Sequence, residues 1–289
     1  MKIKHIYPVS NLISIHSIYT LFEATYTDDY SFPGETHNFW ECVYCFNGRI
    51  TSTSESKIYT LTKGQLLFHK PFEFHKLAVD HDTGASFLIF TFSTEAEDFM
   101  RFFEGKAFSL TSTQVSHMNA MLKFLRDSYN RYFTDLDIAR KKYVRYANVF
   151  HKSNTFSQMV AMYIQMLLLM LSKDGASVLS YTTSNSEIFS KAINYMKINV
   201  SNNISTTEIA KHCAVSVSQL NNIFREHSGI GIHRHFLQFK ISLAMQLLKE
   251  GKNSTQIAYE LGFSSQAYFS YVFKRETNMT PSQYKELKL

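Results

Sequence analysis

The 289-residue sequence predicts an α+β multidomain protein, with a β-rich first part, a helical middle segment and a wholly helical C-terminal domain. Three observations support this prediction. Short aromatic and β-branched runs separated by turn signals occupy the first 110 residues, and a helical spacing of apolar residues begins near residue 113. The last hundred residues contain an internal repeat. The chain is long enough for two domains, each with its own core.

Three runs in the first 110 residues are predicted to be strands because each lies beside a turn signal. They are residues 40–46 before Asn47-Gly48, residues 58–61 before Lys63-Gly64, and residues 86–92 after Thr83-Gly84. Strands this closely spaced, with turns about every 10 to 16 residues, are typical of a sandwich or small barrel. We therefore assign residues 1–110 to a β domain.

The segment 111–172 has the residue spacing of amphipathic helices. Apolar residues recur every three or four positions at Met118, Met121, Leu122, Leu125 and Tyr129, and again at Met159, Met162, Tyr163, Met166 and Met170. Such a stripe packs into a core or, on a helix appended to a β domain, forms the seam of a dimer. We expect a helical dimerisation segment and a homodimer. The Ser- and Thr-rich residues 173–186 are predicted to be a linker.

The positive charge is concentrated in the C-terminal third. Residues 187–289 hold 12 of the 30 Lys and Arg residues but only 7 of the 24 acidic residues. This excess suits a module that binds a polyanion, although a merely basic surface would also have it. Three cysteines suit a reducing compartment. The sequence shows no signal-peptide pattern, and its longest apolar run, 159–171, is short for a bilayer, so we expect a cytoplasmic protein without a membrane partner.

The internal repeat lies within residues 187–289. Thr207, Ile209, Ala210 and Ser216 recur 48 residues later as Thr255, Ile257, Ala258 and Ser264. After the turn the offset is 49, so that Leu220 matches Phe269, Phe224 matches Phe273 and Arg225 matches Lys274. Each copy has the features of a helix-turn-helix unit: a short helix with a small residue, a tight turn, and a second helix that opens with polar residues. A stiff helix over residues 235–250 would hold the two copies at a fixed separation.

The second copy and its continuation carry a specific pattern, Ile257-Ala258-x2-Leu261-Gly262-Phe263-Ser264-x4-Phe269-Ser270-x2-Phe273-Lys274-x5-Thr280-Pro281-Ser282-x-Tyr284. This pattern resembles the signature of the AraC/XylS family of transcription regulators. Leu237, Lys240, Ala244 and Leu247-Leu248 are similar to the connecting helix of that family. The resemblance covers essentially all of residues 187–289. It implies an AraC-type DNA-binding domain whose two recognition helices read adjacent major-groove segments of double-stranded DNA.

Carried over by position, the resemblance also implies which side chains face DNA. The base-facing candidates are Ser218, Gln219, Asn221 and Asn222 on the first recognition helix, and Gln266, Ala267, Ser270 and Tyr271 on the second. Arg225, Lys274 and Arg275 are placed for phosphates, which position a protein without reading sequence. Asn and Gln can pair with adenine, so an A/T-rich site is expected. Lys240, Tyr271 and Asn278 depart from the usual Arg, Arg and Gly of the family, although Asn tolerates a left-handed helix cap.

In the β domain, His37-x3-Glu41, Gly48, Gly64 and Pro71-x3-His75 resemble the degenerate cupin domain that many family members use to sense small molecules. The resemblance covers residues 15–95 and implies a cupin-like sensor barrel. The ligand-binding candidates are His37, Trp40, Glu41, Tyr44, His69 and His75. On a strand, His37 and Glu41 would face the same side.

An organic ligand, a metal ion and a purely structural role are the three interpretations of these residues, and we prefer the organic ligand. Metal-dependent cupins bind their ion with an His-x-His pair, a Glu and a later His. Phe39 stands in place of the second His, so we expect no metal and no cofactor.

Together these observations favour a one-component regulator that is not an enzyme and that responds to a small-molecule effector. A sugar is the first expectation, since family members with such a sensor frequently respond to carbohydrates, and Trp40, Tyr44 and Tyr59 could stack on one. Two alternatives stay open. One is a ligand-independent regulator whose N-terminal domain serves dimerisation or protein binding, and the other is a metal cupin enzyme with an appended DNA-binding domain.

Overall fold

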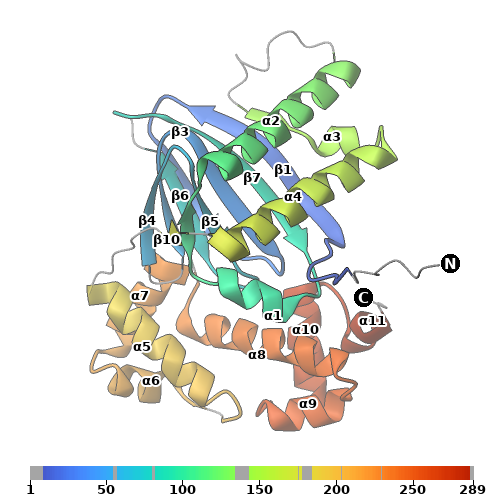
Figure 1. Cartoon of the computed structure of the whole chain (residues 1–289). Helices are drawn as coiled ribbons and strands as arrows, with labels where there is room; N and C mark the ends of the chain where they lie inside the picture. The colour runs from blue at the N-terminus through green and yellow to red at the C-terminus, as the bar shows by residue number, and fades with distance from the viewer. Residues whose placement is uncertain are drawn as a thin grey trace, which may run out of the picture.

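The computed structural model describes residues 9–54, 57–79, 82–133, 143–174, 176–177, 184–202, 204–228 and 230–286. Figure 1 shows a curled β-sheet with two long helices, α2 (Ser112–Tyr132) and α4 (Asn154–Asp174), across one face. The helices of the last hundred residues gather at one end of this sheet. The α+β fold class predicted from the sequence, a β domain followed by a wholly helical domain, is confirmed.

The strands form a ten-stranded antiparallel sheet that divides at its longest member, β3. Its path is β10-β8-β5-β3-β7-β1-β9, while β4 and β6 pair with the second half of β3, and β2 pairs with β6. The strands are β1 (Ser17–Tyr26), β2 (Tyr30–Glu35), β3 (Trp40–Ser54), β4 (Lys57–Thr62), β5 (Gln65–His69), β6 (His75–Val79), β7 (Ala85–Ser93), β8 (Ala107–Ser109), β9 (Tyr143–Arg145) and β10 (Ala176–Ser177). Short helical turns, α1 (Glu97–Met100), η1 (Arg101–Phe103) and α3 (Ala147–Phe150), complete the domain.

Strand β3 changes partners halfway along its length. Residues 40–48 pair with β5 and β7, whereas residues 49–54 pair with β4 and β6. The register shifts between Cys45 and Asn47, and Gly48 has a φ of 72°. Phe46 is therefore the extra residue of a β-bulge, while Asn47 and Gly48 stay paired with β7 in a continuous strand, and the turn predicted at Asn47-Gly48 is wrong. The other two predicted strands are confirmed as β4 and β7, and the turn at Lys63-Gly64 lies between β4 and β5.

The alternation of side chains along β3 supplies two separate cores. Trp40, Cys42 and Tyr44 belong to a core that also contains the inner faces of α2 and α4. Val43 and Cys45 belong to the core enclosed by the curled sheet. Residues that are neighbours in sequence on β3 thus face different cores. Only residues on the same face of the strand can share a ligand site.

The two predicted apolar stripes differ in burial. On α2 the stripe is core, since Met118, Met121, Leu122, Leu125 and Tyr129 are buried. On α4 the buried positions are instead Phe156, Val160, Ile164, Leu167, Leu168 and Leu171, and they leave Met159, Met162 and Met166 38%, 56% and 57% exposed. The segment between these helices returns to the sheet as β9, which pairs with β1.

Helix α4 is longer than the apolar run in the sequence suggests. One helix among the described residues, Asn154–Lys173, has the length and apolar composition that a membrane crossing requires. One face of this helix packs on α2 and the sheet, as expected of an amphipathic helix that borders a core. The predicted linker, 173–186, begins within α4 and includes β10, which pairs with β8. Residues 178–183 lie outside the described residues, so the domain boundaries stay a prediction.

The C-terminal domain is helical throughout its described residues. Its helices are α5 (Ser184–Ile198), α6 (Thr206–His212), α7 (Val217–Ser228), α8 (Ile232–Lys249), α9 (Ser254–Glu260), α10 (Gln266–Thr277) and α11 (Pro281–Glu286). Helices α6 and α7 form the first predicted helix-turn-helix unit, and α9 and α10 form the second. Ser205 and Glu208 make the capping box that the sequence predicts at the start of α6.

The backbone of the two units repeats as the sequence does. In the first turn the N–H of Val215 donates to the carbonyl of Ala210 at 3.1 Å, and in the second the N–H of Phe263 donates to that of Ala258 at 2.8 Å. Ala214 and Gly262 hold the same turn position with φ values of 58° and 61°. The residues that face inward, Leu220 and Phe224 in one unit and Phe269 and Phe273 in the other, are fully buried.

This turn generates a test of the second unit. A Cβ atom at Gly262 would lie 2.5 Å from the carbonyl oxygen of Ser201, in a left-handed conformation that side chains disfavour. We expect Gly262→Ala to lower the free energy of unfolding by about 1–3 kcal/mol, measured by urea denaturation. Ala214→Gly at the matching position is the control. It removes left-handed strain at the cost of backbone entropy, so it should be close to neutral. Equal losses in both variants would contradict this account.

Candidate functional site

The first recognition helix, α7, presents a polar face to solvent. Ser216 caps the helix by accepting a hydrogen bond from the N–H of Gln219 at 3.1 Å. Ser218, Gln219 and Asn222 are exposed, while Asn221 is half-buried. Because Leu220 and Phe224 anchor the opposite face in the core, these four candidates occupy the side of α7 that is free to enter a groove.

The second recognition helix, α10, is built in the same way. Ser265 caps it by accepting from the N–H of Tyr268 at 3.1 Å, and its last turn ends at Asn278 in the left-handed conformation that the sequence allows there. Gln266, Ala267 and Tyr271 are exposed, whereas Ser270 is half-buried. Tyr268, which the sequence comparison passed over, is also 38% exposed at the start of this helix.

The phosphate candidates differ in their surroundings. Arg225 and Lys274 are exposed at matching positions of α7 and α10. Arg275 instead donates to Glu276, with a guanidinium-to-carboxylate distance of 2.7 Å, and lies over the ring of Tyr271 at 5.9 Å. Glu276 also accepts from Gln238 of α8 at 3.0 Å. Glu276 therefore links α10 to α8, and Arg275 is engaged with Glu276 on its own helix.

Helix α8 joins the two units through a buried lysine that the sequence marked only as a departure from the family pattern. Phe236 belongs to the core of the first unit, while Leu237 and Ile241 belong to that of the second. Lys240 is 4% exposed, and its ammonium lies 4.8 Å from the ring centre of Phe236 and 5.5 Å from that of Phe263. Burial lowers the pKa of Lys240. One cation thus packs between an aromatic ring from the core of each unit.

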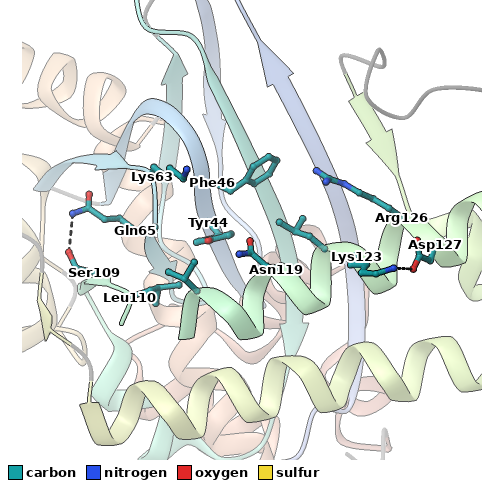
Figure 2. A pocket seen from close by; sticks show the side chains of 13 residues that line it. Tyr44, Phe46, Lys63, Gln65, Ser109, Leu110, Asn119, Lys123, Arg126 and Asp127 are labelled. Carbon is teal, nitrogen blue, oxygen red and sulfur yellow. Dashed lines mark hydrogen bonds and ion pairs between the residues drawn. The ribbon is translucent and has the colours of Figure 1, made fainter. Parts of the chain in front are cut away.

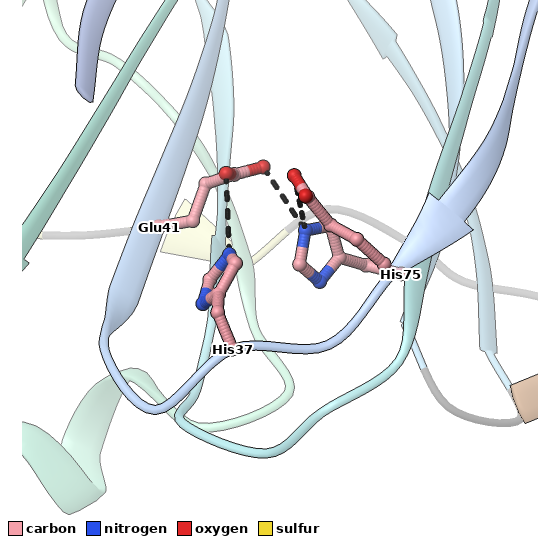
Figure 3. Close-up of side chains that lie close together, drawn as sticks. His37, Glu41 and His75 are labelled. Atoms are coloured by element: carbon pink, nitrogen blue, oxygen red, sulfur yellow. Dashed lines mark ion pairs between the residues drawn. The ribbon is translucent and has the colours of Figure 1, made fainter. Parts of the chain in front are cut away.

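In the β domain the structure brings together four of the six ligand-binding candidates. His37, Glu41 and His75 converge, as Figure 3 shows, and His69 stacks on His75 with ring centres 4.4 Å apart. His37 does not lie on a strand as expected; it belongs to the loop before β3. The distance from its Nε2 to a carboxylate oxygen of Glu41 is 3.5 Å, and the corresponding distance for His75 is 3.3 Å.

Trp40 and Tyr44 are not part of this cluster. They lie on the face of β3 that packs beneath α2 and α4, opposite to Glu41, and both are buried. Tyr59 is also buried, in the core enclosed by the sheet. The stacking platform of three aromatic side chains suggested by the sequence is therefore not assembled in this structure.

Within the cluster, Glu41 and His75 stabilise the charged form of each other. Burial alone would raise the pKa of Glu41, but the facing rings of His75 and His37 outweigh it and hold that pKa well below its usual range. Burial works against protonation of His75, yet the negative charge of Glu41 raises the pKa of His75 to about 9. His69 and Glu73 form a neighbouring buried pair with a nitrogen-to-oxygen distance of 2.8 Å.

A second cavity of about 750 Å³ lies between α2 and the outer face of β3 and β5, and no sequence pattern pointed to it (Figure 2). Tyr44 and Phe46 contribute aromatic surface, and Gln65, Asn119 and Arg126 contribute hydrogen-bonding groups. Arg126 is held by Glu23 of β1 at 2.9 Å. These residues come from separate segments of the chain, so only the fold assembles them.

The two domains also meet along a cavity of about 710 Å³. Its walls include Phe39 and Phe72 from the β domain and Phe239 and Met245 from α8. Phe72 packs against the core of the second helix-turn-helix unit, and the ammonium of Lys76 donates to the carbonyl of Glu226 at the end of α7. The loops that carry the His and Glu cluster thus border the helical domain.

Comparison with known proteins identifies both domains. A family model described as a helix-turn-helix domain matches residues 209–287, and one described as an AraC-like ligand binding domain matches residues 18–127. The HTH-type transcriptional activator RhaR of Shigella dysenteriae serotype 1 is 23% identical over 260 residues, which are 89% of this chain and 88% of that protein.

Two further relatives match about a third of this chain. An uncharacterized HTH-type transcriptional regulator in the cgkA 5′ region of Pseudoalteromonas carrageenovora is 34% identical over 35% of this chain. The probable transcriptional regulator LumQ of Photobacterium leiognathi is 35% identical over 32%. The chain spans 60% and 37% of the lengths of these two relatives.

Among solved structures, ToxT from Vibrio cholerae, with a bound unsaturated fatty acid, covers 96% of this chain at 17% identity and a TM-score of 0.38. An AraC-type DNA-binding regulator from Chromobacterium violaceum covers 36% of this chain and 96% of its own, at 28% identity and a TM-score of 0.34.

Proposed function

Since the chain belongs to the AraC/XylS family of transcription regulators, we propose that it reads a specific DNA sequence with α7 and α10 and that a small molecule bound by its N-terminal domain controls this activity. The observation that carries the proposal is the pair of matched helix-turn-helix units. Each unit buries the apolar side of its second helix and leaves the polar side exposed. One chain thereby offers two reading helices to double-stranded DNA.

The chemistry of the exposed side chains separates residues that can contact bases from residues that can contact phosphates. Amide side chains at Asn222 and Gln266 can pair with base edges, whereas the exposed ammonium of Lys274 suits a phosphate. The remaining base candidates, Ser218, Gln219, Asn221, Ala267, Ser270 and Tyr271, share the same two polar faces, and Arg225 and Arg275 share the phosphate role. Neutralising phosphates releases counterions, so affinity should fall steeply with salt.

We propose a small-molecule effector, and sugars are the first class of compound to test. The cavity beneath α2 supports it, because Gln65 and Asn119 can pair with hydroxyl groups beside the aromatic rings of Tyr44 and Phe46. The His and Glu cluster, with His37, Glu41, His69 and His75, is the other candidate. A regulator without an effector is the alternative, and thermal-shift screening against sugars separates the two. We further propose that the protein is not an enzyme and acts in the cytoplasm, where regulators reach DNA.

We also propose that the chain forms a homodimer through α4. Met159, Met162, Met166 and Leu169 are each at least 38% exposed and share the outward face of this helix, while the opposite face packs on the β domain. A second copy of the same face is the occupant proposed here, since flexible Met side chains adapt to one another across an interface. Dimerisation would place four reading helices on DNA and raise avidity by about 10²–10⁴.

The base and phosphate assignments predict different losses on substitution. Asn222→Ala and Gln266→Ala should each cost about 1–3 kcal/mol on the preferred sequence and little on random DNA. Lys274→Ala should weaken both kinds of DNA equally and reduce the log–log salt slope by about 0.9. Fluorescence anisotropy over a range of salt concentrations measures both effects. The assignment is wrong if all three variants lose affinity equally on specific and random DNA.

The dimer predicts the behaviour of a charge-substituted α4. Met162→Glu combined with Met166→Glu should yield monomers in sedimentation velocity, because it would bury four carboxylates in the interface. Ser116→Glu with Ala120→Glu, on the exposed face of α2, is the matched control and should stay dimeric. If the α4 variant sediments as a dimer, the interface lies elsewhere.

A further inference from the structure

Four side chains of the β domain direct potential metal-binding atoms at a common point. They are Glu35 at the end of β2, His37 in the following loop, Glu41 on β3 and His75 at the start of β6. One donor atom from each lies within 4.8 Å of the other three. Because β2 and β6 are paired with Glu35 opposite His75, the sheet itself sets the position of these two ligands.

The hydrogen bonds of the two imidazoles fix which nitrogen is free. Nδ1 of His37 lies 3.0 Å from the carbonyl oxygen of Phe39, and Nδ1 of His75 lies 3.1 Å from that of Glu73. A carbonyl oxygen can only accept, so Nδ1 is the donor in both rings. In the neutral ring, Nε2 then carries a lone pair. Metal-binding histidines are commonly held by such a bond from the second nitrogen to a backbone carbonyl.

Both Nε2 atoms are buried, and neither has a hydrogen-bond partner among the described residues. They face Glu41, whose oxygens also only accept, at 3.5 Å from His37 and 3.3 Å from His75. These facing groups need a positive charge between them, which is a proton on an imidazole in the metal-free protein or a metal ion that displaces that proton. His69 differs, because its ring contacts Glu73 at 2.8 Å and Ser52 at 3.0 Å and is therefore fully partnered.

We propose that Glu35, His37, Glu41 and His75 bind a divalent transition-metal ion, with Zn²⁺ the best match. Two imidazoles and two carboxylates favour Zn²⁺ over Mg²⁺ or Ca²⁺, which prefer oxygen ligands alone. Ligands of a tetrahedral ion with bonds of roughly 2.0–2.2 Å lie about 3.4 Å apart. Nε2 of His37 lies 3.5 Å from one oxygen of Glu41, and Nε2 of His75 lies 3.3 Å from the other, so both rings are near this spacing. The four donor atoms span up to 4.8 Å and would draw together around an ion.

Glu35 supplies the fourth metal ligand, which could not be identified from the sequence. Phe39 occupies the place of the second histidine of the metal-dependent cupin pattern, and on that ground the sequence predicted no metal. The side chain of Glu35 comes from a different strand and lies 4.0 Å from Nε2 of His75. It is 52% exposed, so it can close over an ion that enters from solvent.

Equilibrium dialysis of Zn²⁺ against the full-length protein, stripped with a chelator beforehand, tests the proposal. Wild type should bind one equivalent tightly. Glu35→Gln keeps the size of the half-exposed side chain, so it should fold and yet weaken that equivalent at least tenfold, as the loss of even an outer-shell partner does. His37→Ala should do the same. His16→Ala, which removes a histidine that is not among the four proposed ligands, is the matched control and should bind as wild type does.

Two further readouts separate a built site from surface binding. Zn²⁺ should raise the melting temperature of wild type and of His16→Ala, and not that of His37→Ala. Co²⁺ in place of Zn²⁺ should give wild type the intense visible absorption of tetrahedral coordination. Glu35→Gln and His37→Ala should lack this absorption. Absence of a tight equivalent in wild type would overturn the proposal. So would an equivalent that survives unchanged in both Glu35→Gln and His37→Ala.

Discussion

Helix α8 packs into the cores of both helix-turn-helix units, and the placement of the two reading helices depends on that shared packing. Phe236 fills the first core, and Ile241, Ala244 and Leu248 fill the second. A short helix-turn-helix unit has too little apolar surface to fix its own orientation, so it takes its position from the element it packs against. Because α8 is one continuous helix, the separation of α7 and α10 is set by its length rather than by a linker.

Lys240 lies where these two packing regions meet. Its stem is buried, and its ammonium reaches the carbonyl of Asn202 at 3.4 Å. Burying a cation is costly, and the aromatic rings of Phe236 and Phe263 offset part of that cost. Phe236 packs in the core of the first unit and Phe263 in that of the second, so the separation of the two cores and the position of the lysine depend on one another.

The helical domain could be predicted from sequence almost completely, since its information is local. The small residues Ala210 and Ala258 and the left-handed turn at Gly262 report backbone geometry directly. The β domain could be predicted only in outline. Asn47-Gly48 has the sequence of a hairpin turn, but both residues pair with β7 beside a bulge at Phe46, and this pairing depends on a strand distant in the sequence.

The ligand candidates show the same limit. Trp40 and Glu41 are adjacent, yet they face different cores because side chains alternate along β3. Glu35 carried no recognisable pattern, and only the pairing of β2 with β6 brings it to His75. The cavity beneath α2 likewise needs the packing of a helix on a distant strand. Which residues share a site is therefore a property of the topology.

The central claim, that α8 holds two reading helices as one rigid unit, is tested most directly by insertions in the DNA. The preferred site is first obtained by selection from random DNA, and the two subsites are then separated by about five or ten additional base pairs. A rigid α8 predicts that both insertions reduce the affinity of a single chain to that of one subsite, because the helix can neither rotate nor extend by a turn. Recovery of affinity with the ten-base-pair insertion would show a flexible connection and contradict the account.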